Sequence, residues 1–121
     1  MKIENFEEIE AWKESRKLVK ELYSGFSACR DFSFKDQIQR AGISIMSNIA
    51  EGFERNKNKE FINFLSIARG SCAEVKSLLY AALDISYIEN DVFNCLHTRI
   101  NKVNGLLNGF ISYLKTNLKQ K

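Results

Sequence analysis

Six polar residues in the middle of the chain have the types and the spacing to bind other groups along one helix face. They recur every three or four positions and form what we call the polar seam: Gln37, Arg40, Ser44, Asn48, Glu51 and Arg55. On a helix that advances 100° per residue, these side chains fall within an arc of about 80°. Arginine suits phosphates and carboxylates, and the amides and the hydroxyl suit base edges or backbone groups.

Two interpretations of the polar seam are open. It can form an interhelical or intersubunit network, in which the arginines pair with Glu51 and Asn48 satisfies nearby backbone or side-chain groups. It can also line a surface that contacts phosphates and base edges. The charges are mixed, with Glu51 among the arginines, and a phosphate groove would be purely basic. The sequence therefore favours the network.

The rest of this helix is nearly all apolar or small, over about 200° of its circumference. An ordinary surface helix carries one apolar stripe and a broad polar face. We therefore expect this helix to be covered on more than one side, either deep in a bundle or against another subunit.

No residue pattern predicts catalysis or metal binding. Cys95 and His97 are two positions apart, so on a helix they diverge by about 200° and cannot share a metal ion or form a nucleophile–base pair. Glu51 and Glu74 could face each other across two helices, but carboxylate di-metal sites in bundles also need Glu-x-x-His on two helices. This chain has one histidine. We therefore expect no enzyme activity, no metal, no cofactor and no small-molecule substrate.

The composition predicts a helical protein of the cytoplasm. The chain has 121 residues, a net charge of +3, three cysteines and no proline. A chain without proline favours long helices joined by short loops. No apolar run approaches the roughly 20 residues that span a bilayer, and the acidic N-terminal segment lacks the apolar core of an export signal. An odd number of cysteines without CxxC spacing indicates reduced thiols.

A basic strip occupies the C-terminal segment. Four of its cations are candidate phosphate contacts, and no acidic residue lies among them: Arg99, Lys102, Lys115 and Lys119. Such a strip fits a nucleic-acid surface. It also fits a helix C-terminus, whose dipole favours cations, and the sequence favours this second interpretation.

Hydrophobic periodicity predicts four helices, at about 5–24, 33–55, 59–84 and 87–118. Asn5 with Glu8, and Ser86 with Glu89, have capping-box spacing, while Ser33 and Asn58 are the expected N-caps of the middle helices. Four amphipathic helices with short connections predict an all-α, antiparallel up-down-up-down four-helix bundle in one domain.

Two glycines four positions apart, Gly105 and Gly109, interrupt the fourth helix. Each costs about 1 kcal/mol of helix propensity. We therefore expect a neighbouring backbone to approach closely at these positions.

The sequence closely resembles the four-helix-bundle family of 23S rRNA intervening-sequence proteins. The resemblance rests on 37–41 (QIQRA), on 44–52 (SIMSNIAEG), on 68–71 (ARGS) and on 59–65, with Phe6, Trp12 and Tyr23 fitting the opening helix. It covers essentially the whole chain. Met46 stands where the family usually has proline, and the family's Phe-Pro pair in the first loop is absent. The absence of the family's proline argues against a kink in the second helix.

The resemblance implies a bundle that assembles into a homo-oligomeric ring, a pentamer in known relatives, without an established biochemical role. It also implies a similarity of fold to the accessory variability proteins of retroelements, which work with a reverse transcriptase and bind nucleic acid. We therefore predict a non-enzymatic, cytoplasmic homo-oligomer with weak RNA or DNA binding and no membrane partner. The alternative is a nucleic-acid-binding accessory module of a reverse transcriptase or another RNA-processing partner. The expected assembly or binding surface comprises the polar seam together with Arg69 and Ser71.

Overall fold

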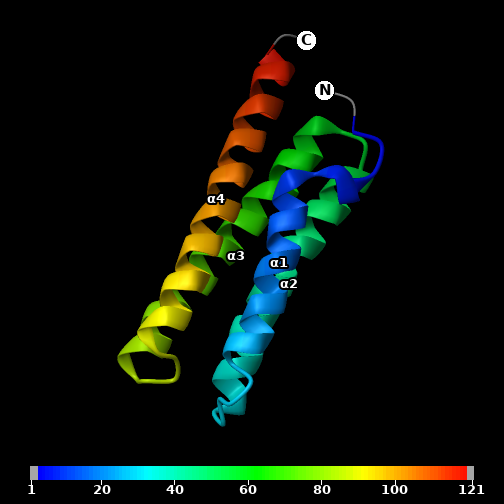
Figure 1. Cartoon of the computed structure of the whole chain (residues 1–121). Coiled ribbons are helices and arrows are strands. Elements are labelled where there is room, and N and C mark those ends of the chain that lie inside the picture. Colours follow the sequence, from blue (N-terminus) through cyan, green and yellow to red (C-terminus); the bar gives the residue numbers. More distant parts are fainter. Residues whose placement is uncertain (1–2, 120–121) are drawn as a thin grey trace.

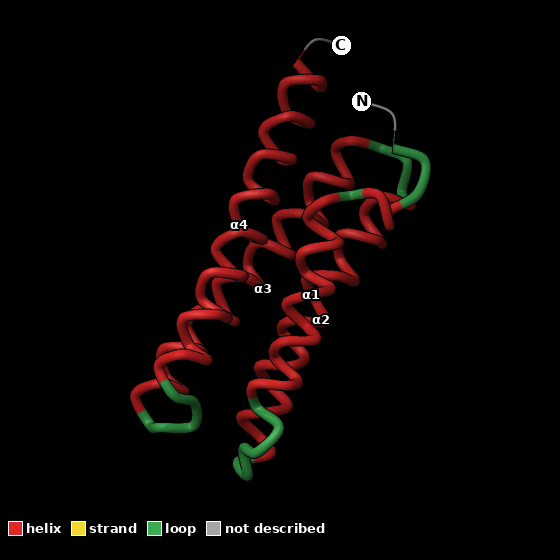
Figure 2. Tube along the Cα trace, in the orientation of Figure 1, coloured by secondary structure: helices red, strands yellow, loops and turns green. Residues whose placement is uncertain are grey.

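The computed structural model describes residues 3–119, and the side chains of residues 3–117. A short 3-10 helix, η1 (Phe6–Glu8), precedes four α-helices: α1 (Glu10–Gly25), α2 (Phe32–Glu54), α3 (Asn58–Asp84) and α4 (Asn90–Lys119). The described residues contain no strand. Figure 2 shows that helices make up nearly all of this part of the chain, with short loops at the two ends of the bundle.

The helices form an antiparallel four-helix bundle with up-down-up-down connections, as the sequence predicts (Figure 1). α2 packs between α1 and α3, and α4 packs between α3 and α1. Each helix therefore contacts two others, and the first helix meets the last. The first described residues, the α2–α3 turn and the end of α4 all lie at one end of the bundle (Figure 1).

The first helix begins later than 5–24 predicts, because Ile9 breaks it. Ile9 has an extended backbone, with φ −73° and ψ 123°, and its side chain is 2% exposed. The Glu8 carboxylate accepts a 2.9 Å hydrogen bond from the backbone N–H of Asn5. The expected cap therefore closes only the short η1, and burial of Ile9 sets the separate start of α1. Gly25 is the last residue of α1.

The N-cap of α2 is Asp31, and the expectation of Ser33 is wrong. The Asp31 carboxylate accepts a 3.1 Å hydrogen bond from the backbone N–H of Phe34. The same carboxylate accepts a 2.6 Å hydrogen bond from the hydroxyl of Tyr87, in the loop between α3 and α4. This second contact could not be read from local spacing, because it joins residues 56 positions apart.

The starts of α3 and α4 also differ from the predicted caps. Asn58 is the first residue of α3, after an N-cap at Lys57 that has no side-chain hydrogen bond. Ser86 has a φ of 63° and lies in the turn, four residues before α4 begins at Asn90. A left-handed backbone at Ser86 cannot serve as an N-cap, whose backbone is extended. The N–H of Phe93 donates instead to the carbonyl of Glu89, at 2.9 Å.

α2 is covered on two sides, and its outward face remains exposed. Ile38, Ile45 and Ile49 are fully buried, whereas Ile43 is 40% exposed. At Gly42 and Gly52 the neighbouring helices come very close, because an added Cβ would lie 2.6 Å from Leu22 Cδ1 or from the Phe64 Cβ. The helix runs without interruption through Met46. Among the described residues, no helix is both long and apolar enough to cross a membrane.

Candidate functional site

The central part of the polar seam forms an interhelical contact between α2 and α3. The hydroxyls of Ser44 and Ser71 lie 3.0 Å apart. The amide of Asn48 donates to the carbonyl of Ser44 at 2.8 Å and to its hydroxyl at 3.1 Å. The amide of Gln37 donates to Glu74 at 3.4 Å, nearer the other end of the contact. These residues therefore satisfy one another within the chain.

The charged residues of the polar seam face solvent instead. The Arg40 guanidinium donates a 2.7 Å hydrogen bond to Asp36, with 79% and 61% of the two side chains exposed. Arg40 does not pair with Glu51, as the network interpretation expected, because Asp36 lies one turn away on the same face. Arg55 lies 4.0 Å from Glu51 and stacks 5.1 Å over the ring of Phe64. The seam is thus one interhelical contact bordered by exposed ion pairs.

Arg69 lies at a different boundary from the seam. Its guanidinium donates a 3.0 Å hydrogen bond to the Asn108 side chain of α4. The structure therefore joins Ser71 to the polar seam but places Arg69 at the contact between α3 and α4.

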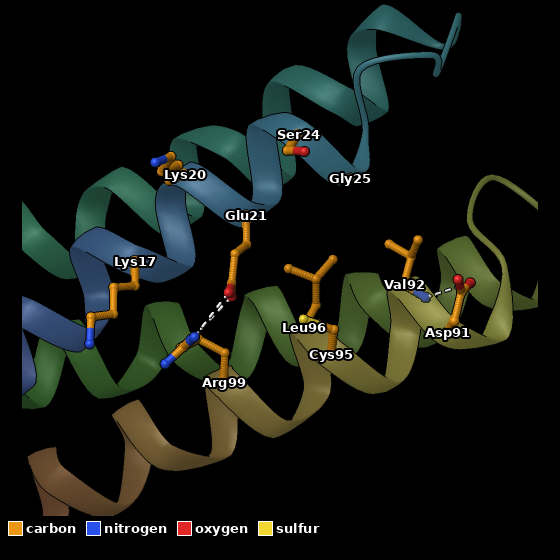
Figure 3. A pocket seen from close by; sticks show the side chains of 10 residues that line it. All are labelled: Lys17, Lys20, Glu21, Ser24, Gly25, Asp91, Val92, Cys95, Leu96 and Arg99. Atoms are coloured by element: carbon orange, nitrogen blue, oxygen red, sulfur yellow. Dashed lines mark hydrogen bonds and ion pairs between the residues drawn. The ribbon is translucent and has the colours of Figure 1, made fainter.

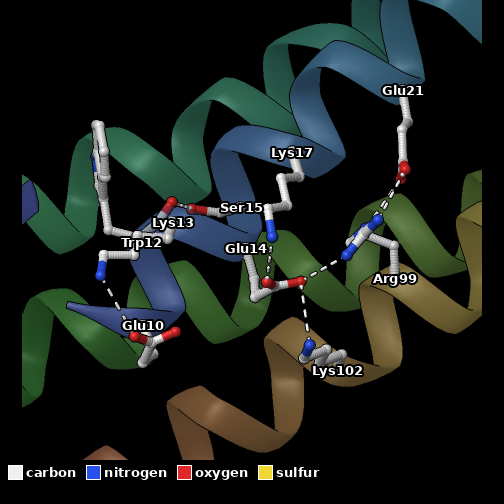
Figure 4. A network of polar contacts seen from close by, with 9 residues as sticks. All are labelled: Glu10, Trp12, Lys13, Glu14, Ser15, Lys17, Glu21, Arg99 and Lys102. Atoms are coloured by element: carbon white, nitrogen blue, oxygen red, sulfur yellow. Dashed lines mark hydrogen bonds and ion pairs between the residues drawn. The ribbon is translucent and has the colours of Figure 1, made fainter. Parts of the chain in front are cut away.

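A network of charges joins α1 to α4, and Figure 4 shows it from close by. The guanidinium of Arg99 donates to Glu14 at 2.6 Å and to the two carboxylate oxygens of Glu21 at 3.1 and 2.9 Å. Lys17 and Lys102 approach Glu14 at 3.1 and 3.6 Å. The Glu14 side chain is 4% exposed and that of Arg99 is 26% exposed. This is the most buried ion-pair cluster among the described residues.

The protonation equilibria reflect this geometry. Desolvation raises the pKa of the Glu14 carboxyl, but hydrogen bonds from Arg99 and Lys17 outweigh it and hold the pKa below 4.5, its ordinary value. Hydrogen bonds to Glu21 and Glu14 raise the pKa of Arg99. Both partners are therefore charged at neutral pH, and the cluster acts as a fixed clamp between the helices.

Sequence reasoning did not single out Glu14 and Glu21 as partners of Arg99. A signal was present in the spacing: Glu14 lies three residues after the buried Ala11 and four before the buried Leu18. A carboxylate at such a position faces the core. A charge buried in this way needs a partner on a facing helix, but the sequence does not say which cation supplies it.

The basic strip does not form a continuous phosphate surface along its first turns. Arg99 and Lys102 point to carboxylates of α1, whereas Lys115 is exposed on α4. Lys119 lies in the last turn of α4, and its side chain is outside the described part. Two of the four candidate phosphate contacts are thus engaged within the chain.

A groove of about 540 Å³ lies beside the network, between the C-terminal half of α1 and the first turns of α4 (Figure 3). The Arg99–Glu21 contact closes one end. At the other end Gly25 lets the helices meet, because an added Cβ would lie 3.1 Å from Val92 Cγ1. The exposed thiol of Cys95 lies on the groove. The groove is lined by both lysines and acidic residues, so it favours neither an anionic nor a cationic ligand.

His97 joins an aromatic cluster between α3 and α4. Its Nε2 atom lies 3.1 Å from the hydroxyl of Tyr80, and its ring stacks on Phe93 with centroids 5.1 Å apart. Its Nδ1 atom lies 3.4 Å from the amide of Asn101. Within residues 3–119, no group of three or more histidine, cysteine, aspartate or glutamate side chains could hold a metal ion.

Comparisons with known proteins agree on one family. The family model described as 23S rRNA-intervening sequence protein matches residues 7–109. A crystal structure of a Bacteroides thetaiotaomicron protein of unknown function, from the S23 ribosomal protein family, is similar over 84% of this chain and 97% of that one. Its identity to this chain is 25%, and the TM-score is 0.78. No curated protein matches the chain.

Proposed function

Because the chain belongs to the family of 23S rRNA-intervening sequence proteins, we propose that it is a non-catalytic structural protein that acts as an assembly of identical copies, a ring of five. The proposal places it in the cytoplasm, where an exposed thiol such as that of Cys95 stays reduced. Its function is then to present the same helical surface once on each copy of the ring, and it carries out no chemical step.

The observation that carries this proposal is a set of helix-interior glycines that face open space. Apart from the adjacent backbone of its own helix, an added Cβ at Gly70, Gly105 or Gly109 would meet no described atom within 4 Å. Each glycine costs about 1 kcal/mol of helix stability relative to alanine. Among the described residues, nothing packs against these glycines to offset that cost, so the close approach of a backbone expected at Gly105 and Gly109 is wrong for a single copy. A helix of a second copy, packed against α3 or α4, supplies it.

The surroundings of these glycines support the same proposal. The outer face of α4 is a line of exposed, small or uncharged side chains: Asn94, Thr98, Asn101, Gly105, Gly109, Ser112 and Thr116. Interfaces between subunits are depleted of charge at their centre, and small residues let helix backbones approach. The outward face of α1, by contrast, carries Glu10, Lys13 and Arg16.

Exposed apolar side chains add to the surface available for assembly. Phe32 and Ile43 of α2 are 70% and 40% exposed, and Ile67 of α3 is 54% exposed. A closed ring needs two different surfaces on each copy, because its contacts are head-to-tail. The outer face of α2 and the outer face of α3 and α4 differ from each other, so they can serve as these two surfaces.

Size-exclusion chromatography with multi-angle light scattering tests the proposal. The chain has a mass of 14.0 kDa, and the expected result is a species of five times that mass at micromolar concentration. Another closed oligomer would overturn the number five, and a monomer at every concentration would overturn assembly itself.

A second candidate function is a nucleic-acid-binding accessory module, and the α2–α3 turn favours it. Arg55, Lys57 and Lys59 are exposed and lie within five residues of one another. Contacts to phosphates release counterions, so such binding weakens steeply with salt. Retention of labelled RNA at 50 mM salt that disappears by 300 mM supports this candidate. Absence of retention at low salt contradicts it.

A further inference from the structure

A polar cleft of about 340 Å³ opens at the end of the bundle where α2 turns into α3, and we call it the end cleft. The last turns of α4 and the segment at Ile3 complete its walls. In Figure 1 this is the end at which the green α2–α3 turn lies beside the start of the described chain. Its volume falls at the lower end of the roughly 300–1,000 Å³ typical of small-ligand pockets.

One wall of the end cleft is aromatic. Phe53, Phe61, Phe110 and Tyr113 follow one another across α2, α3 and α4, with ring centroids 6.0, 5.2 and 6.4 Å apart. Phe61 is buried, whereas Tyr113 is 38% exposed and Phe110 is half-buried. The inner rings therefore fix the position of the outer ones. Tyr113 is the most exposed ring of this row.

Side-chain amides also line the end cleft. Asn56 and Asn58 line the end cleft from the α2–α3 turn, and Asn117 lines it from α4. Within residues 3–117, the side-chain amides of Asn56 and Asn58 make no hydrogen bond, so their donors and acceptors are available to a ligand. Each amide presents a donor beside an acceptor. This is the pattern by which asparagine recognises a base edge.

The charge of the end cleft selects an anion over a cation. Lys57 is the one charged residue among the described residues that line it, and the segment around that lysine carries both cations, Arg55 and Lys59, and carboxylates, Glu54 and Glu60. The α1–α4 groove differs, because Glu21 and Asp91 are among its lining residues. A planar ligand that carries hydrogen-bonding edges and a negative group thus fits the end cleft best.

We propose that the end cleft binds an unpaired nucleobase with its ribose phosphate. The base stacks against Tyr113 and Phe110, the amides of Asn56 and Asn58 contact its edge, and Lys57 contacts the phosphate. Unpaired bases are recognised by proteins through this combination of aromatic stacking and edge hydrogen bonds. The ligand is either a free nucleotide or a base in a single strand, and the single strand rests on the nucleic-acid candidate above.

Fluorescence of 2-aminopurine tests the proposal, because its emission changes when the base stacks. The full-length protein is titrated with 2-aminopurine riboside monophosphate, with a single-stranded RNA that contains one 2-aminopurine, and with the duplex of that RNA. We expect the emission of the single strand to change at low salt, and that of the duplex to stay the same.

Matched variants assign the binding to the end cleft. Asn56→Gly keeps the backbone, whose φ of 60° suits glycine, and removes the amide. Tyr113→Leu removes the stacking ring, and Tyr113→Phe keeps it. We expect affinity to fall roughly tenfold or more for Tyr113→Leu, as loss of a stacked base predicts. Asn56→Gly should fall by about tenfold as well, as loss of a base-edge contact predicts. Tyr113→Phe should stay within threefold. Asn90→Ala, which removes an exposed amide at the start of α4, at the other end of the bundle, should match the unmodified chain.

Each outcome decides the proposal. If the free monophosphate binds as tightly as the strand and loses affinity in the same variants, the site stands and its ligand is a nucleotide. If RNA binds but the emission and the variants show no change, the end cleft is not the site, and the nucleic-acid candidate survives. If neither probe binds at low salt, both are overturned.

Discussion

The Glu14 carboxylate on α1 accepts a 2.6 Å hydrogen bond from the Arg99 guanidinium on α4, although the two residues lie 85 positions apart. This contact joins the first helix to the last. Another N–H group of the same guanidinium donates to Glu21, which also lies on α1. The pair α1–α4 closes the bundle, because the other neighbours are joined by turns. A buried ion pair between α1 and α4 fixes the position of one helix along the other.

Removal of the Arg99 charge should destabilise the bundle strongly. Arg99→Met keeps much of the apolar stem but leaves the carboxylate of Glu14 buried with only Lys17 and Lys102 nearby. Breaking a buried pair from one side costs about 3–5 kcal/mol, and we expect the lower end because these two lysines remain. Urea unfolding followed by circular dichroism measures the loss.

The matched control is Lys13→Met, which breaks the exposed ion pair with Glu10. Exposed pairs contribute little, so this variant should change the free energy of unfolding by less than about 1 kcal/mol. A double variant, Glu14→Leu with Arg99→Met, should recover part of the loss, because an apolar pair leaves no buried charge. Equal losses in Arg99→Met and Lys13→Met would show that the network is not a clamp.

Acid should remove the contribution of Glu14. Its pKa in the fold lies below 4.5, its ordinary value in an unfolded chain, so the folded state binds fewer protons than the unfolded state. Stability from this group is therefore fully present above about pH 5.5 and is lost as the pH falls through 4.5 towards the folded pKa. We expect the difference in unfolding free energy between the unmodified chain and Glu14→Gln to shrink over that range.

Denaturant unfolding at pH 7, 5, 4 and 3.5 measures this difference directly. The comparison with Glu14→Gln removes the contributions of other carboxyls such as Asp31, whose pKa the Tyr87 hydrogen bond lowers from 3.8. A gap between the two proteins that stays constant from pH 7 to 3.5 would contradict the assignment.

The cap of α2 should depend on the carboxylate of Asp31 more than on the hydroxyl of Tyr87. Asp31→Ala removes both the bond from Phe34 and the 2.6 Å bond from Tyr87. Loss of a side-chain N-cap costs about 1 kcal/mol, and the buried area of Tyr87 is not affected. We expect Asp31→Ala to unfold at a lower temperature than the unmodified chain, measured by thermal unfolding.

Two further variants separate the parts of this contact. Asp31→Asn keeps an acceptor for Phe34 and should lose less than half as much as Asp31→Ala. Tyr87→Phe removes only the exposed hydroxyl bond and should lower the melting temperature by less than Asp31→Ala does. An unchanged melting temperature for Asp31→Ala would instead support Ser33 as the cap.

The sequence predicts the four helices well, since periodicity reports which face of each helix is buried. Ile38, Ile45 and Ile49 lie on the apolar face of 33–55 and are all fully buried. The helix starts are predicted poorly, because several residues near each start can cap it. Asp31 prevails over Ser33 because it also binds Tyr87, from the loop that follows α3. That choice depends on tertiary structure.

The candidate sites were also predicted only in part from the sequence. Spacing alone aligns Ser44 and Asn48 on one face, and the structure places them in hydrogen-bonding contact. Spacing does not say that Arg99 turns to α1, because the side of α4 that meets α1 is fixed only by packing. The sequence therefore left open that the basic strip is one phosphate surface, whereas in the structure its first two cations bind Glu14.

Glycine substitutions should separate the glycines that the bundle itself uses from those that a second copy uses. At Gly42 an added Cβ would lie 2.6 Å from Leu22 Cδ1, whereas at Gly109 it would meet open space. Gly42→Ala should lose about 1–3 kcal/mol from overpacking. Gly109→Ala adds helix propensity of up to about 1 kcal/mol, which should appear in the unfolding of any monomeric chain.

Larger side chains at the open position test assembly. Gly109→Leu places a branched side chain where we propose that two helix backbones meet, so it should lower the mass measured by light scattering towards 14.0 kDa. The circular dichroism of the bundle should remain, because no described atom outside the adjacent backbone of α4 lies within 4 Å of the new Cβ. Lys13→Leu, which adds the same side chain to the charged face of α1, is the control and should leave the mass unchanged. If Gly109→Leu assembles as the unmodified chain does, the outer face of α4 at this position is not an interface between copies, and assembly must use another surface, such as that of Phe32 and Ile43.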